Sequence, residues 1–131
     1  MHNSLLGSRL GKWSAADPDV GCGVWDDDED QLWKFVKPNP DNKPGYYYIY
    51  NKKYTTARLA LWSGGWGQKW GTFTGRKYND QLFKPTNVGG NRFRINSNVS
   101  GREKFGMWSK EGCGWGDWAN DDDQIWSLVE G

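Results

Sequence analysis

The sequence predicts an all-β domain built from three similar units, and three observations lead to this prediction. The chain of 131 residues contains 18 glycines and 5 prolines, a composition that favours short strands and tight turns over helices. Segments 46–50, 58–62 and 92–96 are rich in aromatic and β-branched residues or alternate in polarity, as strands do. A set of short motifs also recurs three times in the same order.

The recurring motifs define the units. Gln-aliphatic-aromatic occurs at Gln31, Gln81 and Gln124, which are 50 and 43 residues apart. A Trp-Ser pair precedes each glutamine, and a Gly- and Trp-rich segment lies between the two motifs. A length of 131 residues suits one domain with its own core. We therefore expect a single domain over 1–131, with repeats of about 1–37, 45–87 and 90–131.

Composition excludes several classes of partner. A net charge of +1 provides no global field toward nucleic acid or an anionic membrane, and no stretch approaches the roughly 18 apolar residues of a membrane helix. Mean hydropathy is −0.91, yet the chain has 10 Trp, 6 Tyr and 5 Phe. Aromatic residues must therefore build most of the core, or many of them are displayed for binding.

Alternation along the strands predicts which side chains face the core. Leu59 and Leu61 share one face of segment 58–62, and Ala60 and Trp62 share the other. The same parity places Leu10, Phe105 and Met107 inward in the other two repeats. The outward face then carries Gly11, Trp13, Ala60, Trp62, Gly106 and Trp108.

Three β-units of about forty residues, each ending in Gln-x-aromatic, resemble the ricin-B-type (R-type, Gln-x-Trp) lectins, which are β-trefoils. The resemblance spans nearly the whole chain. It implies a six-stranded barrel capped by three hairpins, with a shallow sugar site on the outer surface of each lobe. A β-propeller or a solenoid fits less well, because three blades are too few and no strict short period exists.

Repeat 1 departs from the other two at its start. Repeats 2 and 3 have a strand residue 13 positions before the Trp-Ser tryptophan, at Ile49 and Ile95, but the same count from Trp13 runs off the chain. We expect the first strand to be missing or reduced to a stub within Met1–Leu5. We further hypothesise that a partner subunit, as in a homodimer, or a rearranged terminus closes the exposed edge.

Candidate ligand contacts follow from the chemistry of sugars, which present an apolar C–H face and a rim of hydroxyls. An aromatic plate suits the face, and fixed carboxylates or amides suit the rim. Carried over by the resemblance, the plates are Trp13, Trp62 and Trp108, and the hydroxyl acceptors are Asp30, Asp80 and Asp123. The small residues two positions before each plate would leave room for a sugar ring. The alternative interpretation is that these tryptophans pack under neighbouring loops and cover the core.

Two departures from the R-type pattern add candidates. The plates lie 18, 19 and 16 residues before the motif glutamine, whereas about ten is usual in the family. The longer loops offer further tryptophans, chiefly Trp25 and Trp118, and also Trp66, Trp70 and Trp115. The early Asp of the pattern is replaced by amides, at Asn3, Asn51 and either Asn96 or Asn98.

Other motifs are interpreted as structural. We expect Trp33, Phe83 and Trp126 of the Gln-x-aromatic motifs to belong to the core, and the three glutamines to bond the backbone or orient the acceptor carboxylate. The acid run Asp26–Asp30 offers oxygen ligands for calcium but lacks the spacing of a calcium loop, so carboxylate turns are favoured and no metal is expected. Cys22 and Cys113 are expected to be free thiols.

Catalysis is not expected, nor is a cofactor. His2 is the sole histidine and lies at the chain terminus, so a Ser-His or Cys-His pair would depend on it. The sequence therefore predicts a non-catalytic, multivalent lectin, a haemagglutinin type of protein, that binds glycan termini through Trp stacking and Asp or Asn hydrogen bonds. Galactose or N-acetylgalactosamine is the ligand that the resemblance implies. The alternative is a trefoil that binds proteins, as a protease inhibitor or a cytoskeletal binder.

The compartment is predicted from the termini and the cysteines. The N-terminal segment has too short an apolar core for a secretory signal, and two cysteines do not make a disulfide framework. We expect a soluble protein that is cytoplasmic or non-classically secreted, with glycans on glycoproteins or glycolipids as partners, no nucleic acid and no membrane insertion.

Overall fold

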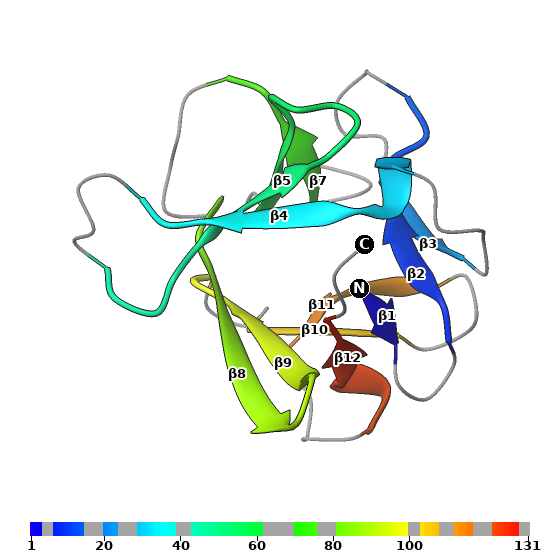
Figure 1. Cartoon of the computed structure of the whole chain (residues 1–131), viewed down its shortest axis with the longest axis vertical. Helices are drawn as coiled ribbons and strands as arrows, with labels where there is room; N and C mark the ends of the chain where they lie inside the picture. Colours follow the sequence, from blue (N-terminus) through cyan, green and yellow to red (C-terminus); the bar gives the residue numbers. More distant parts are fainter. Residues whose placement is uncertain are drawn as a thin grey trace.

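The three repeats fold into three lobes of four strands each in the computed structural model of the chain (Figure 1). The structure describes residues 1–3, 7–14, 20–23, 29–38, 43–61, 70–75, 81–99, 103–107, 112–116 and 122–128, with the backbone alone for His2. Lobe 1 contains β1 (His2–Asn3), β2 (Arg9–Gly11), β3 (Gly21–Gly23), the 3₁₀ turn η1 (Glu29–Gln31) and β4 (Trp33–Val36). Lobe 2 contains β5 (Tyr48–Asn51), β6 (Arg58–Leu61), β7 (Trp70–Phe73) and β8 (Phe83–Gly89). Lobe 3 contains β9 (Arg92–Ser97), β10 (Lys104–Met107), β11 (Cys113–Gly116), the 3₁₀ turn η3 (Asp122–Gln124) and β12 (Trp126–Ser127).

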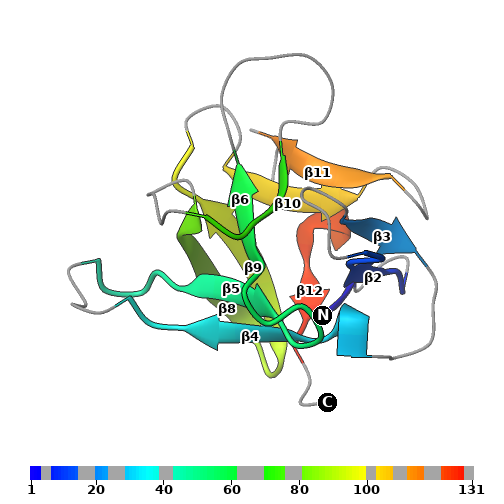
Figure 2. The same ribbon diagram turned by 90° about the horizontal axis from the view of Figure 1, so that it is seen from above.

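Strand pairing follows the same rule in every lobe. The second and third strands form antiparallel hairpins, which are β2–β3, β6–β7 and β10–β11. The fourth strand pairs with the first strand of the next lobe, in β4–β5, β8–β9 and β12–β1. Figure 2 shows the hairpins gathered on one side of these wall strands. The pattern is the barrel capped by three hairpins that the resemblance implied.

Aromatic side chains fill the interior. Trp126 and Phe105 are fully buried and stack with their ring centroids 4.3 Å apart, and Trp115 stacks on the other side of Phe105 at 4.7 Å. The five side chains predicted to face inward, Leu10, Leu59, Leu61, Phe105 and Met107, are all at most 2% exposed. The strand parity read from the sequence is therefore confirmed. Stacked ring pairs of this kind stabilise by about 0.5–1.5 kcal/mol beyond their burial of area.

The first strand of lobe 1 is present as a stub. β1 has two residues, which pair with β12 through His2↔Ser127 and Asn3↔Trp126 and with β2 through His2↔Arg9. The edge expected to need a partner subunit is thus paired within one chain, and the structure gives the homodimer no support. At the neighbouring junction the Trp33 indole Nε1 donates a hydrogen bond of 2.9 Å to the carbonyl of Leu10, so a side chain links β4 to β2.

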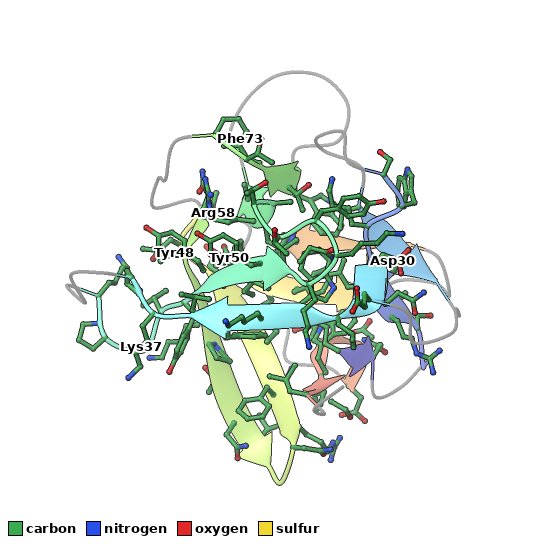
Figure 3. All side chains as sticks on the ribbon, turned by 45° about the horizontal axis from the view of Figure 1, so that its top comes forward. Asp30, Lys37, Tyr48, Tyr50, Arg58 and Phe73 are labelled. Carbon is green, nitrogen blue, oxygen red and sulfur yellow. A yellow bond between two sulfur atoms is a disulfide. The ribbon has the colours of Figure 1, made fainter. Side chains whose placement is uncertain are left out.

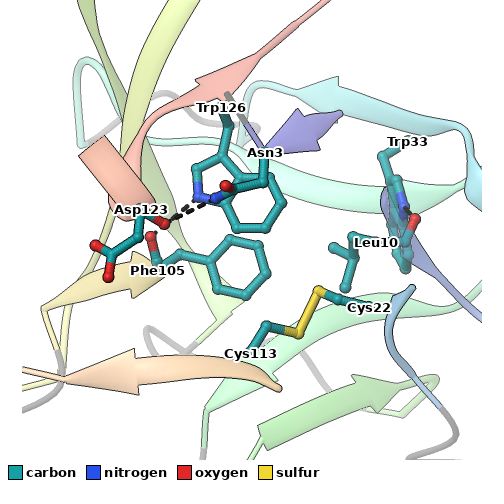
Figure 4. The surroundings of a disulfide bond; sticks show 8 residues. All are labelled: Asn3, Leu10, Cys22, Trp33, Phe105, Cys113, Asp123 and Trp126. Carbon is teal, nitrogen blue, oxygen red and sulfur yellow. Dashed lines mark hydrogen bonds between the residues drawn. A yellow bond between two sulfur atoms is a disulfide. The ribbon is translucent and has the colours of Figure 1, made fainter. Parts of the chain in front are cut away.

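The expectation of two free thiols is wrong. Cys22 on β3 and Cys113 on β11 form a disulfide, with Cα atoms 6.0 Å apart and a sequence separation of 91 (Figure 4). The two cysteines lie in corresponding hairpins of lobes 1 and 3 but not at corresponding positions. Strand register shows that Cys22 opposes Leu10 whereas Cys113 opposes Met107, so they are offset by two residues within their hairpins. That offset brings the two side chains together where the hairpins of lobes 1 and 3 meet.

No helix in the described part of the chain is long and apolar enough to span a membrane. Trp13, two residues after β2, reaches the surface of lobe 1, whereas Ala60 on β6, which was expected to face outward, is only 2% exposed.

Candidate functional site

Trp13 is displayed on the surface of lobe 1. It follows β2, and its side chain is 57% exposed, the largest exposed fraction among the large hydrophobic residues that the structure describes. The ring is seated on Gly21, because a Cβ added there would lie 2.9 Å from Cζ3 and 3.3 Å from Cη2 of the indole. Gly21 is the cross-strand partner of Gly11. Gly21 therefore makes room for the tryptophan ring. The expectation that Gly11 leaves room for a sugar ring stays a prediction.

Asp30 is tied through its backbone to the residue before this tryptophan, because η1 is bonded to the end of β2. The backbone N–H of Lys12 donates to the carbonyl of Asp30 at 2.9 Å, and the Asn51 amide Nδ2 donates to the same oxygen at 2.9 Å. The carboxylate Oδ1 of Asp30 is buried and accepts no hydrogen bond from the residues that the structure describes. A buried acceptor without a donor costs about 1–3 kcal/mol. Asp30 as a whole is half-buried, so a ligand hydroxyl would meet only the part of the side chain that reaches solvent.

Asp123 repeats the arrangement in lobe 3. The Asn3 amide Nδ2 donates to the carbonyl of Asp123 at 2.7 Å, as Figure 4 shows, and the Oδ1 of Asp123 is likewise buried without a donor among the described residues. Asn3 and Asn51 are the cross-strand partners of Trp126 and Trp33, and they are 2% and 1% exposed. These amides hold the acceptor turns, so the assignment of Asn3 as a sugar contact is not carried further.

The third amide candidate is displaced by the register. Ser97 pairs with Phe83 and so occupies in lobe 3 the position of Asn3 and Asn51, whereas Asn98 lies one residue beyond the strand and is half-buried. Asn98 therefore does not occupy the position that Asn3 and Asn51 have in their lobes. Its role as a ligand contact stays a prediction.

The Gln-x-aromatic motif serves the fold. The Trp126 indole Nε1 donates to the carbonyl of Phe105 at 3.0 Å, which repeats the bond from Trp33 to Leu10. Gln31, Gln81 and Gln124 are at most 6% exposed. Gln81 Oε1 accepts a hydrogen bond of 2.9 Å from the Nε of Arg58. Trp126 and Phe83 are fully buried and Trp33 packs partly buried against them, so the predicted structural role of these aromatics is confirmed.

Several predicted contacts fall outside the described residues. They are the plates Trp62 and Trp108, the acceptor Asp80, the loop tryptophans Trp25, Trp66 and Trp118, and Asp26–Asp28 of the acid run. Two other loop candidates are corrected by the structure. Trp70 begins β7 and Trp115 lies in β11, and each is 7% exposed in the core. The segments taken as loops around them contain the third strands of lobes 2 and 3.

Sequence reasoning missed an outward row of side chains on β4 to β7. Lys34 pairs with Tyr50, Tyr50 with Arg58, and Arg58 with Phe73, so four neighbouring strands each contribute one side chain. Phe73 is 37% exposed, and its ring is seated on Gly75, where an added Cβ would lie 2.7 Å from Cζ. Ile49 is buried in β5, so Tyr48 and Tyr50 on either side of it lie on the outer face of the strand. Phe73 was missed because β7 was taken as a loop.

This row is organised around Arg58, as Figure 3 shows. The guanidinium carbon lies 5.6 Å from the centroid of the Tyr50 ring, and the Nη2 group donates to the carbonyl of Gly75. Arg58 is only 4% exposed. Tyr48 packs edge-on against Tyr50 with centroids 6.4 Å apart. Two half-exposed tyrosines and one exposed phenylalanine are thus held on a buried arginine.

The described residues contain no candidate metal site, since they include no group of three or more His, Cys, Asp or Glu side chains that could hold a metal ion.

Comparison with solved structures decides the fold. The designed three-fold symmetric protein ThreeFoil matches with a TM-score of 0.80 and 19% identity, over 98% of this chain and 95% of that one. A BEL β-trefoil matches with a TM-score of 0.78 and 21% identity, over 96% and 87%. The chain is a β-trefoil. SeviL, solved with the asialo-GM1 saccharide, matches with a TM-score of 0.73 and 18% identity over 98% and 93%. No protein-family model and no curated protein matches the sequence.

Proposed function

We propose that this β-trefoil is a non-catalytic, multivalent carbohydrate-binding protein of the lectin type. The observation that carries the proposal is the pairing in lobe 1 of an exposed, preorganised tryptophan ring with a carboxylate turn. Trp13 is 57% exposed, and Asp30 is tied by its carbonyl to Lys12, the residue before that tryptophan. Such a pairing meets the two needs of a sugar site, which are a plate for the C–H face and an acceptor for a hydroxyl.

The proposed contacts differ in their chemistry. Gly21 supports the tip of the Trp13 ring, so little conformational entropy is lost when a sugar stacks on it. Asp30 is half-buried and its carboxylate would accept one hydroxyl hydrogen through the part that reaches solvent, and the half-buried Asp123 offers the same group in lobe 3. We include Trp62, Trp108, Asp80, Trp25 and Trp118 by analogy between the lobes. Gly71 and Gly114 take the place of Gly21 in the other two hairpins and would seat Trp62 and Trp108 in the same way.

The structural neighbours support a sugar as the ligand class. SeviL was solved bound to the asialo-GM1 saccharide, and its fold superposes on nearly the whole of this chain. A further match, with a TM-score of 0.79 and 23% identity, is to an exo-β-1,3-galactanase of Clostridium thermocellum, of which this chain spans 29%. We propose terminal galactose or N-acetylgalactosamine for the neutral site. Three such lobes on one chain would turn weak single contacts into avidity on a glycan-covered surface.

The disulfide bears on where the protein works. Structural disulfides persist in oxidising compartments and are rare in the cytosol. Of the two locations expected from the sequence, the Cys22–Cys113 bond favours the extracellular one. We propose a soluble protein that meets glycoproteins or glycolipids outside the cell.

A glycan array followed by tryptophan replacement tests the function. Trp13→Ala is expected to weaken binding to neutral galactosides about tenfold to a hundredfold, since central aromatic anchors contribute about 1.5–3 kcal/mol. Trp108→Ala tests lobe 3 in the same assay, and titration of tryptophan fluorescence gives the affinity of each site.

The matched control is Val88→Ala, which removes another exposed apolar side chain, 41% exposed at the far end of β8. Sugar binding that survives both tryptophan replacements would refute these plates. Absence of sugar binding, together with capture of a protein ligand by the loops, would favour the protease-inhibitor or cytoskeletal-binder alternative.

A further inference from the structure

The near-zero net charge hides a strong separation of charge along the chain. Residues 31–110 contain 15 of the 17 lysines and arginines, whereas 13 of the 16 acidic residues lie outside that range. Lobe 2 and the strands that flank it are therefore basic. The acidic residues concentrate in the N-terminal 30 and C-terminal 21 residues, which belong to lobes 1 and 3.

The basic region is exposed on the surface. The described residues between 31 and 99 contain no carboxylate side chain. Their cations include the exposed Lys34 and Lys37 on and just after β4, Lys52 and Lys53 after β5, and Lys84 on β8. An anion that approaches this part of the protein meets several positive charges, so its local concentration is raised. Glu29 and Asp30 border the region at Lys52, because the neighbouring Asn51 donates to the carbonyl of Asp30.

The row of Lys34, Tyr50, Arg58 and Phe73 lies within this basic surface. Directly paired residues of neighbouring strands point to the same side of a sheet, so the row presents an exposed ammonium, a tyrosine ring and a phenylalanine ring in sequence across the strands. Figure 3 shows Tyr48, Tyr50 and Arg58 close together, with Asp30 on the other side of the view. The acidic acceptor turn of lobe 1 is therefore away from this face.

Comparison of the lobes separates the structural part of the row from the part that varies. The central cation recurs, as Arg9 in lobe 1 and Lys104 in lobe 3. Its strand partners do not, because β1 and β9 supply His2 and Asn96, and β3 and β11 supply Gly23 and Gly116. Arg58 is buried and bonded to Gln81, which accounts for the repeated cation by folding. The exposed lysine recurs as well, because Lys84 on β8 pairs with Asn96 as Lys34 pairs with Tyr50. The two rings, Tyr50 and Phe73, are therefore the part that is particular to this row.

We propose that the face formed by Lys34 on β4 of lobe 1 and by β5, β6 and β7 of lobe 2 binds glycans that carry a sulfate or a carboxylate group. The Tyr50 and Phe73 rings would stack on the apolar faces of the sugar, and Lys34 with its neighbouring lysines would meet the anionic substituent. The proposal deepens the carbohydrate-binding function proposed above and rests on it. It assigns different ligands to different lobes, a neutral sugar to Trp13 and Asp30 and an acidic sugar to this face.

Titration of a heparin-derived hexasaccharide into the wild-type protein tests the proposal. The hexasaccharide is expected to bind at least tenfold more tightly than its desulfated form, and binding should weaken as ionic strength rises from 50 to 300 mM. A sialylated oligosaccharide in a parallel titration separates carboxylate from sulfate recognition. Phe73→Ala and Lys34→Glu are each expected to weaken hexasaccharide binding about five- to twentyfold.

The matched control is Arg92→Glu, which makes the same charge change as Lys34→Glu at the exposed first residue of β9. Equal losses in the two charge variants would refute a defined site, because a diffuse effect of net charge would then explain the binding. Tighter binding of an oligothymidylate than of the hexasaccharide would refute it as well. If the wild-type protein binds neutral galactosides but not the hexasaccharide, this inference alone is overturned. If the wild-type protein binds neither ligand, the proposed function is overturned as well.

Discussion

Lobes 1 and 2 display an aromatic ring in the same way but place different charged groups near it. In each lobe an exposed aromatic ring is seated on a glycine, Trp13 on Gly21 and Phe73 on Gly75. The residue before the first ring is bonded to a carboxylate turn, whereas the second ring is paired across the strands with Arg58. The comparison teaches that the trefoil fixes where a ring can be displayed, while the neighbouring strands decide which charge a ligand meets.

The largest expected effect is on stability and comes from removing the Cys22–Cys113 disulfide, which lobe 1 has and lobe 2 lacks. The disulfide ties the hairpins of lobes 1 and 3, and the described residues of lobe 2 contain no cysteine. With a sequence separation of 91 between the cysteines, the chain-entropy model predicts a loss of about 4–5 kcal/mol in the free energy of unfolding for the double variant Cys22→Ala, Cys113→Ala. Urea unfolding followed by tryptophan fluorescence measures it.

A single hairpin substitution in lobe 2 is the control for this prediction. Strand register gives Thr72 the place in lobe 2 that Cys22 has in lobe 1, and Thr72 is fully buried. Thr72→Ala is expected to cost only about 1–2 kcal/mol, the effect of one buried hydrogen bond and a methyl group. A cysteine variant no less stable than this control would show that the link adds nothing beyond local packing.

The next comparison isolates the acceptor of lobe 1. Asp30→Asn keeps the shape of the side chain but removes its charge, so binding of neutral galactosides is expected to weaken about tenfold. The free energy of unfolding should change by less than about 0.5 kcal/mol, since the buried oxygen accepts no hydrogen bond from the described residues. Binding of the sulfated hexasaccharide to lobe 2 should be unaffected. A stability loss as large as the affinity loss would make Asp30 a structural residue.

Features that are set within one short segment could be predicted from the sequence, whereas features that depend on how distant strands pair could not. Repeats and alternation predicted three β-units and the inward face of the hairpins, because Leu10, Leu59 and Phe105 lie in short segments whose pattern is complete in itself. The resemblance correctly implied the trefoil. It also implied that the motif aromatics are core, and Phe83 and Trp126 are fully buried.

Features set by register were not predictable from one chain. The disulfide depends on a two-residue offset between hairpins that only the pairing reveals. Asn3 and Asn51 were read as ligand groups because their burial depends on strands that reach them from other parts of the chain. The row of Lys34, Tyr50, Arg58 and Phe73 joins residues that are up to 39 positions apart, and no local pattern connects them.

The smallest expected effects come from replacing the glycine under each ring. These substitutions compare the two rings without changing either of them. Gly21→Ala adds a methyl group 2.9 Å from the Trp13 ring, and Gly75→Ala adds one 2.7 Å from the Phe73 ring, so each ring must shift from its seat. Each variant is expected to weaken its own ligand about two- to fivefold, or roughly 0.5–1 kcal/mol, and to leave the other ligand unchanged. Neither glycine has a positive φ, so the backbone accepts alanine at both positions. Titration of both variants with galactoside and with sulfated hexasaccharide gives the four affinities, and equal losses for both ligands in one variant would show that the lobes do not act separately.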